Sequence, residues 1–123
     1  MQSWILVFLG GGLGSMVRYG IGQYFSSYDS NFPIGTFLSN LLACLILGIL
    51  IGIQLKNNLS TNMGLLFMTG FCGGFSTFST FSGETLKLFQ NNQIAMALIY
   101  VGGSIICGLI AVYLGIKLQS SLG

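Results

Sequence analysis

The sequence carries very little charge for its length. Its 123 residues include four basic side chains, two acidic side chains and no histidine. A soluble domain of this size needs a charged and polar surface, and this chain lacks the residues to make one. Nucleophile–base pairs, phosphate-binding loops and metal-binding clusters are also missing from the sequence. The composition therefore excludes a soluble domain and gives no support to an enzyme.

The three cysteines, Cys44, Cys72 and Cys107, form no recognisable pattern. None belongs to a CxxC motif or a Cys/His spacing, and each falls within an apolar stretch. A disulfide framework and a metal cluster are therefore both unsupported, and we interpret the cysteines as packing residues. The net charge of +2 is too small for the basic patch that nucleic-acid binding needs.

Long apolar runs occupy most of the chain. Crossing a hydrocarbon core of about 30 Å takes about 20 helical residues. The sequence predicts one domain, residues 1–123, of an all-α membrane protein with four transmembrane helices near residues 4–25, 33–55, 62–88 and 94–117. The third of these helices is expected to break at 73–77. Because the first lacks a basic leader and a small-residue cleavage site, we expect it to be a span and not a signal peptide.

The charges that flank the spans give a weak orientation signal. An even number of spans puts both termini on one side with Lys56 and Lys117, and Asp29 and Lys87 on the other. Cationic loop residues fix membrane orientation, and a count of two against one leaves little bias. Such a chain can insert both ways, which permits an antiparallel dual-topology dimer. Four short helices leave little room for a pore, so we expect a pore to need the second chain.

Glycine pairs with GxxxG spacing occur in three of the four spans. They are Gly10 with Gly14, Gly48 with Gly52, and Gly70 with Gly74. This spacing lets helix backbones approach closely in lipid. We expect close helix packing, with some of these pairs lying inside one chain.

The third apolar segment differs from the other three. Gly73 and Gly74 are followed by serines and threonines, which make a poor helix interior near the bilayer midplane. Broken backbone at that depth is found where it is buried in protein or lines a wet cavity. Half-helix ends of this kind bind ions in transporters. The alternative is a continuous helix whose small residues form a packing seam.

Aromatic and hydroxyl residues recur every third position after these glycines. They are Phe75, Phe78 and Phe81, then Ser76, Ser79 and Ser82, with Thr77 and Thr80 between them. Residues three apart lie near one another on a helix, so an aromatic stripe should run beside a hydroxyl stripe. Hydroxyls donate hydrogen bonds and the edge of a phenyl ring is electropositive, so the pairing suits an anion. A phenylalanine stripe standing alone would indicate ordinary packing.

These residues resemble a known family. Residues 70–82 are similar to the third helix of the Fluc (CrcB) family of bacterial fluoride channels, whose pattern is close to GFxGGxTTFSTFS. Residues 11–19, residues 35–40, and Tyr100 with Ser104 resemble the family's other three motifs in the same order, so the resemblance covers the whole chain. Two positions depart from the family pattern: Ser76 replaces a usual threonine, and Gly108 stands where a third hydroxyl of a polar track is expected.

The resemblance implies a fluoride channel that exports fluoride passively across the bacterial plasma membrane, with two pathways in an antiparallel dimer. It assigns the fluoride pathway to Asn40, Phe78, Phe81, Thr80, Tyr100 and Ser104, and the vestibule to Arg18 and Glu84. It also implies a structural Na⁺ at the dimer interface, held by the backbone carbonyls of Gly73 and Ser76. A homodimer in membrane lipid is expected, and pairing with a paralogous chain stays open.

Simpler explanations exist for several of these residues. Arg18 can snorkel to the interface, Asn40 can form an interhelical bond, and Glu84 can cap a helix. A small multidrug-resistance exporter also has four short helices, but it carries an acid in the first span, where this chain has Arg18. With carboxylates only at Asp29 and Glu84, the chain has no obvious proton relay. A holin or structural subunit would need no broken helix.

Overall fold

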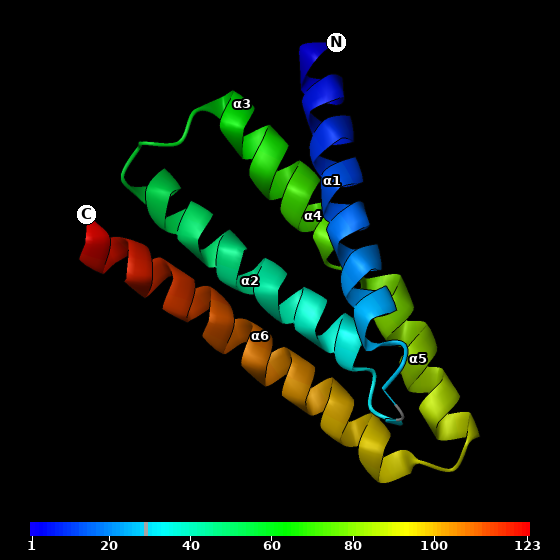
Figure 1. The fold of residues 1–123 in the computed structure, drawn as a ribbon. Helices are drawn as coiled ribbons and strands as arrows, with labels where there is room; N and C mark the ends of the chain where they lie inside the picture. The colour runs from blue at the N-terminus through cyan, green and yellow to red at the C-terminus, as the bar shows by residue number, and fades with distance from the viewer. Residues whose placement is uncertain (29) are drawn as a thin grey trace.

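The fold is entirely helical over residues 1–28 and 30–123, which the computed structural model describes. Asp29, which the sequence predicts to lie on the membrane side opposite the two termini, is outside the described residues. Figure 1 shows long helices that lie side by side or cross one another. In chain order they are α1 (Gln2–Phe25), α2 (Ile34–Leu55), α3 (Thr61–Gly64), the π-helical segment η1 (Leu65–Cys72), α4 (Gly73–Phe75), α5 (Phe78–Gln90) and α6 (Ile94–Leu122).

Three of these helices are each long and apolar enough to cross a membrane: α1, α2 and α6. The remaining crossing is assembled from α3, η1 and α4, which run on without a gap, followed by α5 after a short interruption. The predicted all-α fold of four helices with a bent third helix is confirmed. The chain is a multi-pass membrane protein.

The helices pack as two pairs. In Figure 1, α1 lies against the segment made of η1 and α4, while α2 lies along α6. The two pairs meet where α2 contacts α1, η1 and α4, and α5 packs against α6. This arrangement brings the interruption before α5 close to α1 on one side and to α2 on the other.

Glycines form the seam between α1 and the first half of the third span. A Cβ added at Gly10 would overlap the Leu66 carbonyl oxygen, and one at Gly74 would overlap the backbone of Gly11. A Cβ at Gly70 would lie 3.0 Å from the Gly10 Cα. Two of the predicted GxxxG pairs therefore hold helices of the same chain together.

The third predicted glycine pair has the same role between α2 and α6. A Cβ added at Gly48 would collide with the Val112 carbonyl oxygen and would lie 3.0 Å from the Gly115 Cα. A Cβ added at Gly52 would lie 2.7 Å from the Gln119 Cβ. The faces of α1 and α6 that point away from these seams carry many exposed apolar side chains, as expected for lipid contact.

Substitution of Gly115 with alanine is expected to destabilise the chain. The added Cβ would overlap the Leu45 carbonyl oxygen and lie 2.7 Å from the Ile49 amide nitrogen, and such overpacking costs about 1–3 kcal/mol. Gly102→Ala in the same helix is the matched control, because nothing lies within 4 Å of its Cβ position. Unfolding in detergent should shift for the first variant only. Equal stability of the two variants would contradict the packing seen here.

The loop between α2 and α3 lies at the same end of the molecule as the C-terminus of α6. The Lys56 ammonium donates a hydrogen bond to the Gln119 carbonyl oxygen at 3.2 Å. A cation there also complements the negative end of the α6 dipole. The predicted placement of Lys56 beside the C-terminal end of the chain is confirmed.

Candidate functional site

The interruption of the third span is only two residues long. Ser76 and Thr77 have extended backbone, with ψ angles of 159° and 120°, and helix resumes at Phe78. The sequence placed the break over 73–77, but Gly73 and Gly74 are helical. Gly74 is small for a different reason, since it packs directly against Gly11. The glycines therefore allow close approach of α1, and the hydroxyl residues after them carry the break.

Asn40 on α2 holds the extended backbone in place. Its Oδ1 accepts a hydrogen bond from the Thr77 amide at 2.8 Å, and its Nδ2 donates to the Thr77 carbonyl at 3.4 Å. The side-chain amide thus replaces the helical partners that Thr77 loses at the break. Backbone groups without partners are costly at membrane depth, so this pair of bonds stabilises a break that the chain could not otherwise keep.

Arg18 on α1 covers the end of the first half-helix. Its Nε donates to the Gly74 carbonyl at 3.0 Å, and the Ser15 hydroxyl donates to the same oxygen at 3.4 Å. Carbonyls at a helix C-terminus lack helical partners and carry the negative end of the dipole, so a cation there is favourable. The guanidinium therefore points inward to the break and does not snorkel to the interface.

The second half-helix, α5, begins directly after the break, where Phe78, Ser79 and Thr80 are exposed in the single chain. The Thr77 hydroxyl accepts a hydrogen bond from the Thr80 amide at 3.2 Å, which caps the first turn. Helix N-termini carry partial positive charge and unsatisfied amides, and they are favourable places for an anion.

A cavity of about 300 Å³ opens at this N-terminus. It gathers residues from α2, the break, α5 and α6, namely Asn40, Cys44, Ser76, Thr77, Phe78, Phe81, Ser104 and Ile105. This cavity is thus lined by four of the residues predicted for the pathway: Asn40, Phe78, Phe81 and Ser104. The Ser104 hydroxyl is buried and has no hydrogen-bond partner among the described residues. An unpaired donor beside a cavity is available to a bound ion.

Phe81 connects this cavity to a buried polar group. Its ring lies 4.9 Å from the Tyr100 ring, centroid to centroid, and Tyr100 is completely buried. The Tyr100 hydroxyl donates to Glu84 Oε1 at 2.9 Å, and the Thr36 hydroxyl donates to Glu84 Oε2 at the same distance. Both carboxylate oxygens of Glu84 are therefore occupied by hydroxyl donors from two other helices.

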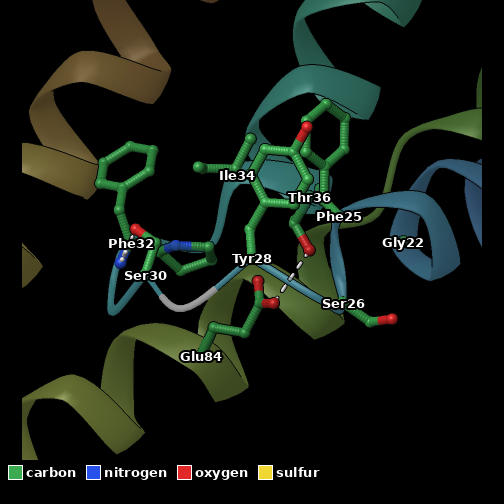
Figure 2. A pocket seen from close by; sticks show the side chains of 11 residues that line it. Gly22, Phe25, Ser26, Tyr28, Ser30, Phe32, Ile34, Thr36 and Glu84 are labelled. Atoms are coloured by element: carbon green, nitrogen blue, oxygen red, sulfur yellow. Dashed lines mark hydrogen bonds between the residues drawn. The ribbon is translucent and has the colours of Figure 1, made fainter.

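Glu84 also lines an outer cavity of about 260 Å³ beside the connection between α1 and α2. Figure 2 shows its carboxylate directed at Thr36, with the Tyr28 and Phe25 side chains nearby. The structure thus places Glu84 between the buried Tyr100 and a cavity formed by the connection between α1 and α2 and the adjoining ends of these helices.

Thr80 and Arg18 line a different cavity, of about 180 Å³. Thr80 was predicted for the pathway, but it is not on the wall that carries Phe78 and Phe81. The Arg18 cavity shares Gly22, Gly35 and Thr36 with the cavity beside Glu84. The two predicted vestibule residues therefore lie on neighbouring surfaces that meet at Thr36.

Of the two residues predicted to hold Na⁺, Gly73 is exposed, whereas Ser76 is half-buried and lines two cavities. In a continuous helix the Thr77 amide would bond to the Gly73 carbonyl, but here it donates to Asn40. Gly73 is exposed, and nothing lies within 4 Å of its Cβ position. The Ser76 hydroxyl donates to the Cys72 carbonyl at 2.8 Å. The Gly73 carbonyl therefore loses its helical partner at an exposed position, and a carbonyl is the kind of hard oxygen ligand that Na⁺ prefers.

Sequence reasoning assigned no role to Thr36, Thr77 or Ser15. Thr77 had a local signal, because a threonine directly before a helix is a common N-cap. Thr36 and Ser15 had none, since their partners Glu84 and Gly74 lie 48 and 59 residues away in the chain. Contacts of that range come from helix packing and not from local pattern.

Comparison with known proteins identifies the family. The sequence profile described as "CrcB-like protein, Camphor Resistance (CrcB)" matches residues 5–116. The chain belongs to the CrcB family. A "Fluoride-specific ion channel FluC" from Azobacteroides pseudotrichonymphae is 46% identical over 112 residues, which are 89% of this chain and 90% of the relative.

Two further relatives carry the same name. The protein from Oceanobacillus iheyensis is 44% identical over 96% of this chain and 92% of its own length. The protein from Flavobacterium psychrophilum is 37% identical over 99% of this chain and 100% of its own length. The family resemblance seen in the motifs is therefore confirmed over nearly the whole of this CrcB-family chain. The relatives are ion channels and not enzymes.

Proposed function

We propose that the chain is a fluoride-specific ion channel that exports fluoride passively across the bacterial plasma membrane and so lowers its toxicity in the cytoplasm. The observation that carries this proposal is the cavity at the N-terminus of α5, where Asn40, Phe78, Phe81 and Ser104 converge. Two relatives that match this chain over nearly their whole length are named fluoride-specific ion channels, and these names support the choice of ion. The family match removes the multidrug exporter and the non-transporting assembly as alternatives.

The cavity suits a small anion because hydrogen-bond donors and electropositive ring edges gather in its wall. The positive end of the α5 dipole, the free hydrogen of the Asn40 amide and the Ser104 hydroxyl favour negative charge. The rings of Phe78 and Phe81 lie 5.9 Å apart, centroid to centroid, and contribute electropositive edges. Among the residues that the structure describes, no carboxylate lines this cavity.

The route from this cavity to the outside runs past Phe81 and Tyr100 toward Glu84. The Tyr100 and Thr36 hydroxyls, which both donate to Glu84, are the polar groups along it. Glu84 is a repulsive group on this route, and its two hydroxyl donors disperse its charge. The Arg18 guanidinium lies on the adjoining surface and raises the local concentration of anions there.

The pathway is completed by a second chain in an antiparallel dimer. Phe78 is 79% exposed although it lies at the break in the middle of a span, and Gly73 beside the break is exposed as well. The three GxxxG pairs are already used inside one chain, so the exposed aromatic face is what remains for a partner. Two chains related by an in-plane two-fold axis would form two pathways. A second copy of this chain supplies the matching face, and a paralogous chain with the same residues would also fit.

A structural Na⁺ at the interface of this dimer fits the carbonyls of Gly73 and Ser76. Replacing Na⁺ with N-methyl-D-glucamine throughout purification and assay is expected to lower fluoride efflux by roughly tenfold. The reason is that an ion held only by the assembled dimer stabilises it by about 2.7 kcal/mol at a hundred times its dissociation constant. Returning Na⁺ should restore the flux. Unchanged efflux and unchanged dimer content without Na⁺ would contradict this site.

The function itself is tested by reconstituting the purified chain alone into liposomes. We expect fluoride efflux down its gradient, which membrane voltage modulates and which a proton gradient does not drive, and no comparable efflux of chloride. Liposomes without protein are the control. Uphill fluoride movement powered by a proton gradient would replace the channel with an antiporter, and equal chloride efflux would overturn the fluoride assignment.

A further inference from the structure

A second cavity, of about 180 Å³, lies between α2 and η1 and contains three sulfur side chains. Cys44 comes from α2, and Met68 and Cys72 come from η1. Apart from Gly73 and Ser76 at one edge, the rest of the wall is the apolar pair Ala43 and Leu47. Met68 and Cys72 do not line the cavity of the proposed fluoride pathway, no role in that pathway has been given to the Cys44 thiol, and all three cysteines of the chain are free thiols.

The chemistry of this cavity favours soft metal ions. Thiolate and thioether ligands select Ag⁺ and Cu⁺ over hard cations such as Na⁺ and Mg²⁺. Among the described residues no carboxylate lines the cavity, and away from the backbone of Gly73 and Ser76 its wall gives a hard cation little to replace its hydration shell. Two cysteines and a methionine from two neighbouring elements provide up to three soft ligands around one small space.

The same cavity touches the proposed fluoride pathway. Cys44 and Ser76 line both this cavity and the one that holds Phe78 and Phe81. A Cβ at Gly108 on α6 would lie 3.4 Å from the Cys44 sulfur, so this thiol fills the space where a third hydroxyl of the polar track was expected. An ion on the Cys44 sulfur would therefore stand at the wall of the pathway.

The two thiols also flank the hydrogen bonds that hold the break. Cys44 is one helical turn after Asn40 on α2, and the Cys72 carbonyl accepts hydrogen bonds from the Ser76 amide and hydroxyl at 3.0 and 2.8 Å. Drawing Cys44 and Cys72 onto one ion would shift the position of Asn40 relative to Ser76 and Thr77. The break geometry and the pathway wall would change together.

We propose that Cys44, Cys72 and Met68 bind one soft monovalent cation, and that the bound ion stops conduction. Each thiol that binds the metal loses its S–H bond, forms an S–metal bond and releases its proton to water, with no change of oxidation state. The binding half of this proposal is independent of the channel function, whereas the inhibition half rests on it.

The test measures fluoride efflux from proteoliposomes in chloride-free nitrate buffer with Ag⁺ as the probe. Ag⁺ is expected to reduce wild-type efflux at least tenfold, in line with loss of about 1.4 kcal/mol or more of pathway stabilisation. Cys44→Ser and Cys72→Ser should each need roughly a hundredfold more Ag⁺ for the same fractional inhibition, because each loses a first ligand. Met68→Leu keeps the volume of the side chain and should show a smaller loss of sensitivity.

Cys107→Ser is the matched control, because Cys107 lies on α6 and lines neither cavity. It should keep both the efflux and the sensitivity to Ag⁺. If it loses the sensitivity, or if Cys44→Ser and Cys72→Ser keep it, the proposed site is wrong. Each variant is compared with its own efflux without Ag⁺, so a change in conduction does not obscure the result.

Silver content per chain, measured by elemental analysis after gel filtration, separates the two halves of the proposal. We expect one bound Ag⁺ in the wild type and in Cys107→Ser, and none in the Cys44→Ser, Cys72→Ser double variant. If the wild type binds one Ag⁺ but conducts no fluoride, the channel function fails and the metal site stands. If it conducts fluoride but retains Ag⁺ equally in all variants, the site fails and the function stands.

Discussion

Replacing Phe78 or Phe81 with isoleucine is expected to slow fluoride efflux by roughly tenfold each, because an aromatic contact is worth about 1–1.5 kcal/mol and each 1.4 kcal/mol is a factor of ten. Isoleucine keeps the apolar bulk of the side chain and removes the electropositive ring edge. The double variant should lose about a hundredfold if the rings act separately. Initial efflux rates from proteoliposomes, normalised to dimer content, measure the effect.

The two positions should differ in stability although they agree in efflux. Phe81 packs on the buried Tyr100 ring at 4.9 Å, so its loss should also destabilise the chain by about 1 kcal/mol. Phe78 is 79% exposed in the single chain, so its replacement should leave chain stability nearly unchanged. Phe89→Ile on the same helix is the control, because Phe89 does not line the cavity. Wild-type efflux from both Phe78→Ile and Phe81→Ile would exclude the ring-edge mechanism.

The helices and their seams were predictable because they follow from local pattern. Long apolar runs determine which residues cross a membrane. The GxxxG spacing of Gly10, Gly48 and Gly70 with their partners indicates where backbones approach. What the spacing does not contain is the identity of the opposing helix. All three pairs serve packing inside one chain.

The exact position of the break was not predictable from propensity. Gly73 and Gly74 are the weakest helix formers in the segment, and they are helical because α1 packs against Gly74. The break falls two residues later, where Asn40 provides partners to the Thr77 backbone across 37 residues of sequence. Arg18 similarly had two local explanations, and its contact with the Gly74 carbonyl was visible only after the helices were assembled.

The gathering of Asn40, Phe78, Phe81 and Ser104 around one cavity is likewise a property of packing. The period of three placed the two phenylalanines on one face of α5, which is a local inference. Their meeting with Ser104 depends on how α5 lies against α6. Thr80 shows the limit of the same inference, because it belongs to the hydroxyl pattern but lies beside Arg18.

Substitution of Asn40 with alanine is expected to have the largest effect of all, abolishing efflux by at least about a hundredfold. The variant leaves both the amide and the carbonyl of Thr77 without partners, and each such group costs about 1–3 kcal/mol when buried. The total of roughly 2–6 kcal/mol is comparable with the whole stability of a small domain. Efflux and unfolding in detergent should both report the loss. Ser39→Ala next to it on α2 is the control, since that buried hydroxyl has no partner among the described residues.

Asn40→Asp separates support of the break from attraction of the anion. Aspartate keeps an oxygen that accepts from the Thr77 amide, so the backbone bond at 2.8 Å survives and stability should fall less than in Asn40→Ala. It loses the donor and places a negative charge on the wall of the cavity, which repels an anion. Efflux should therefore be as low as in Asn40→Ala while the folded fraction is higher. If Asn40→Asp conducts fluoride like the wild type, Asn40 acts only through the backbone of Thr77 and does not contact the ion.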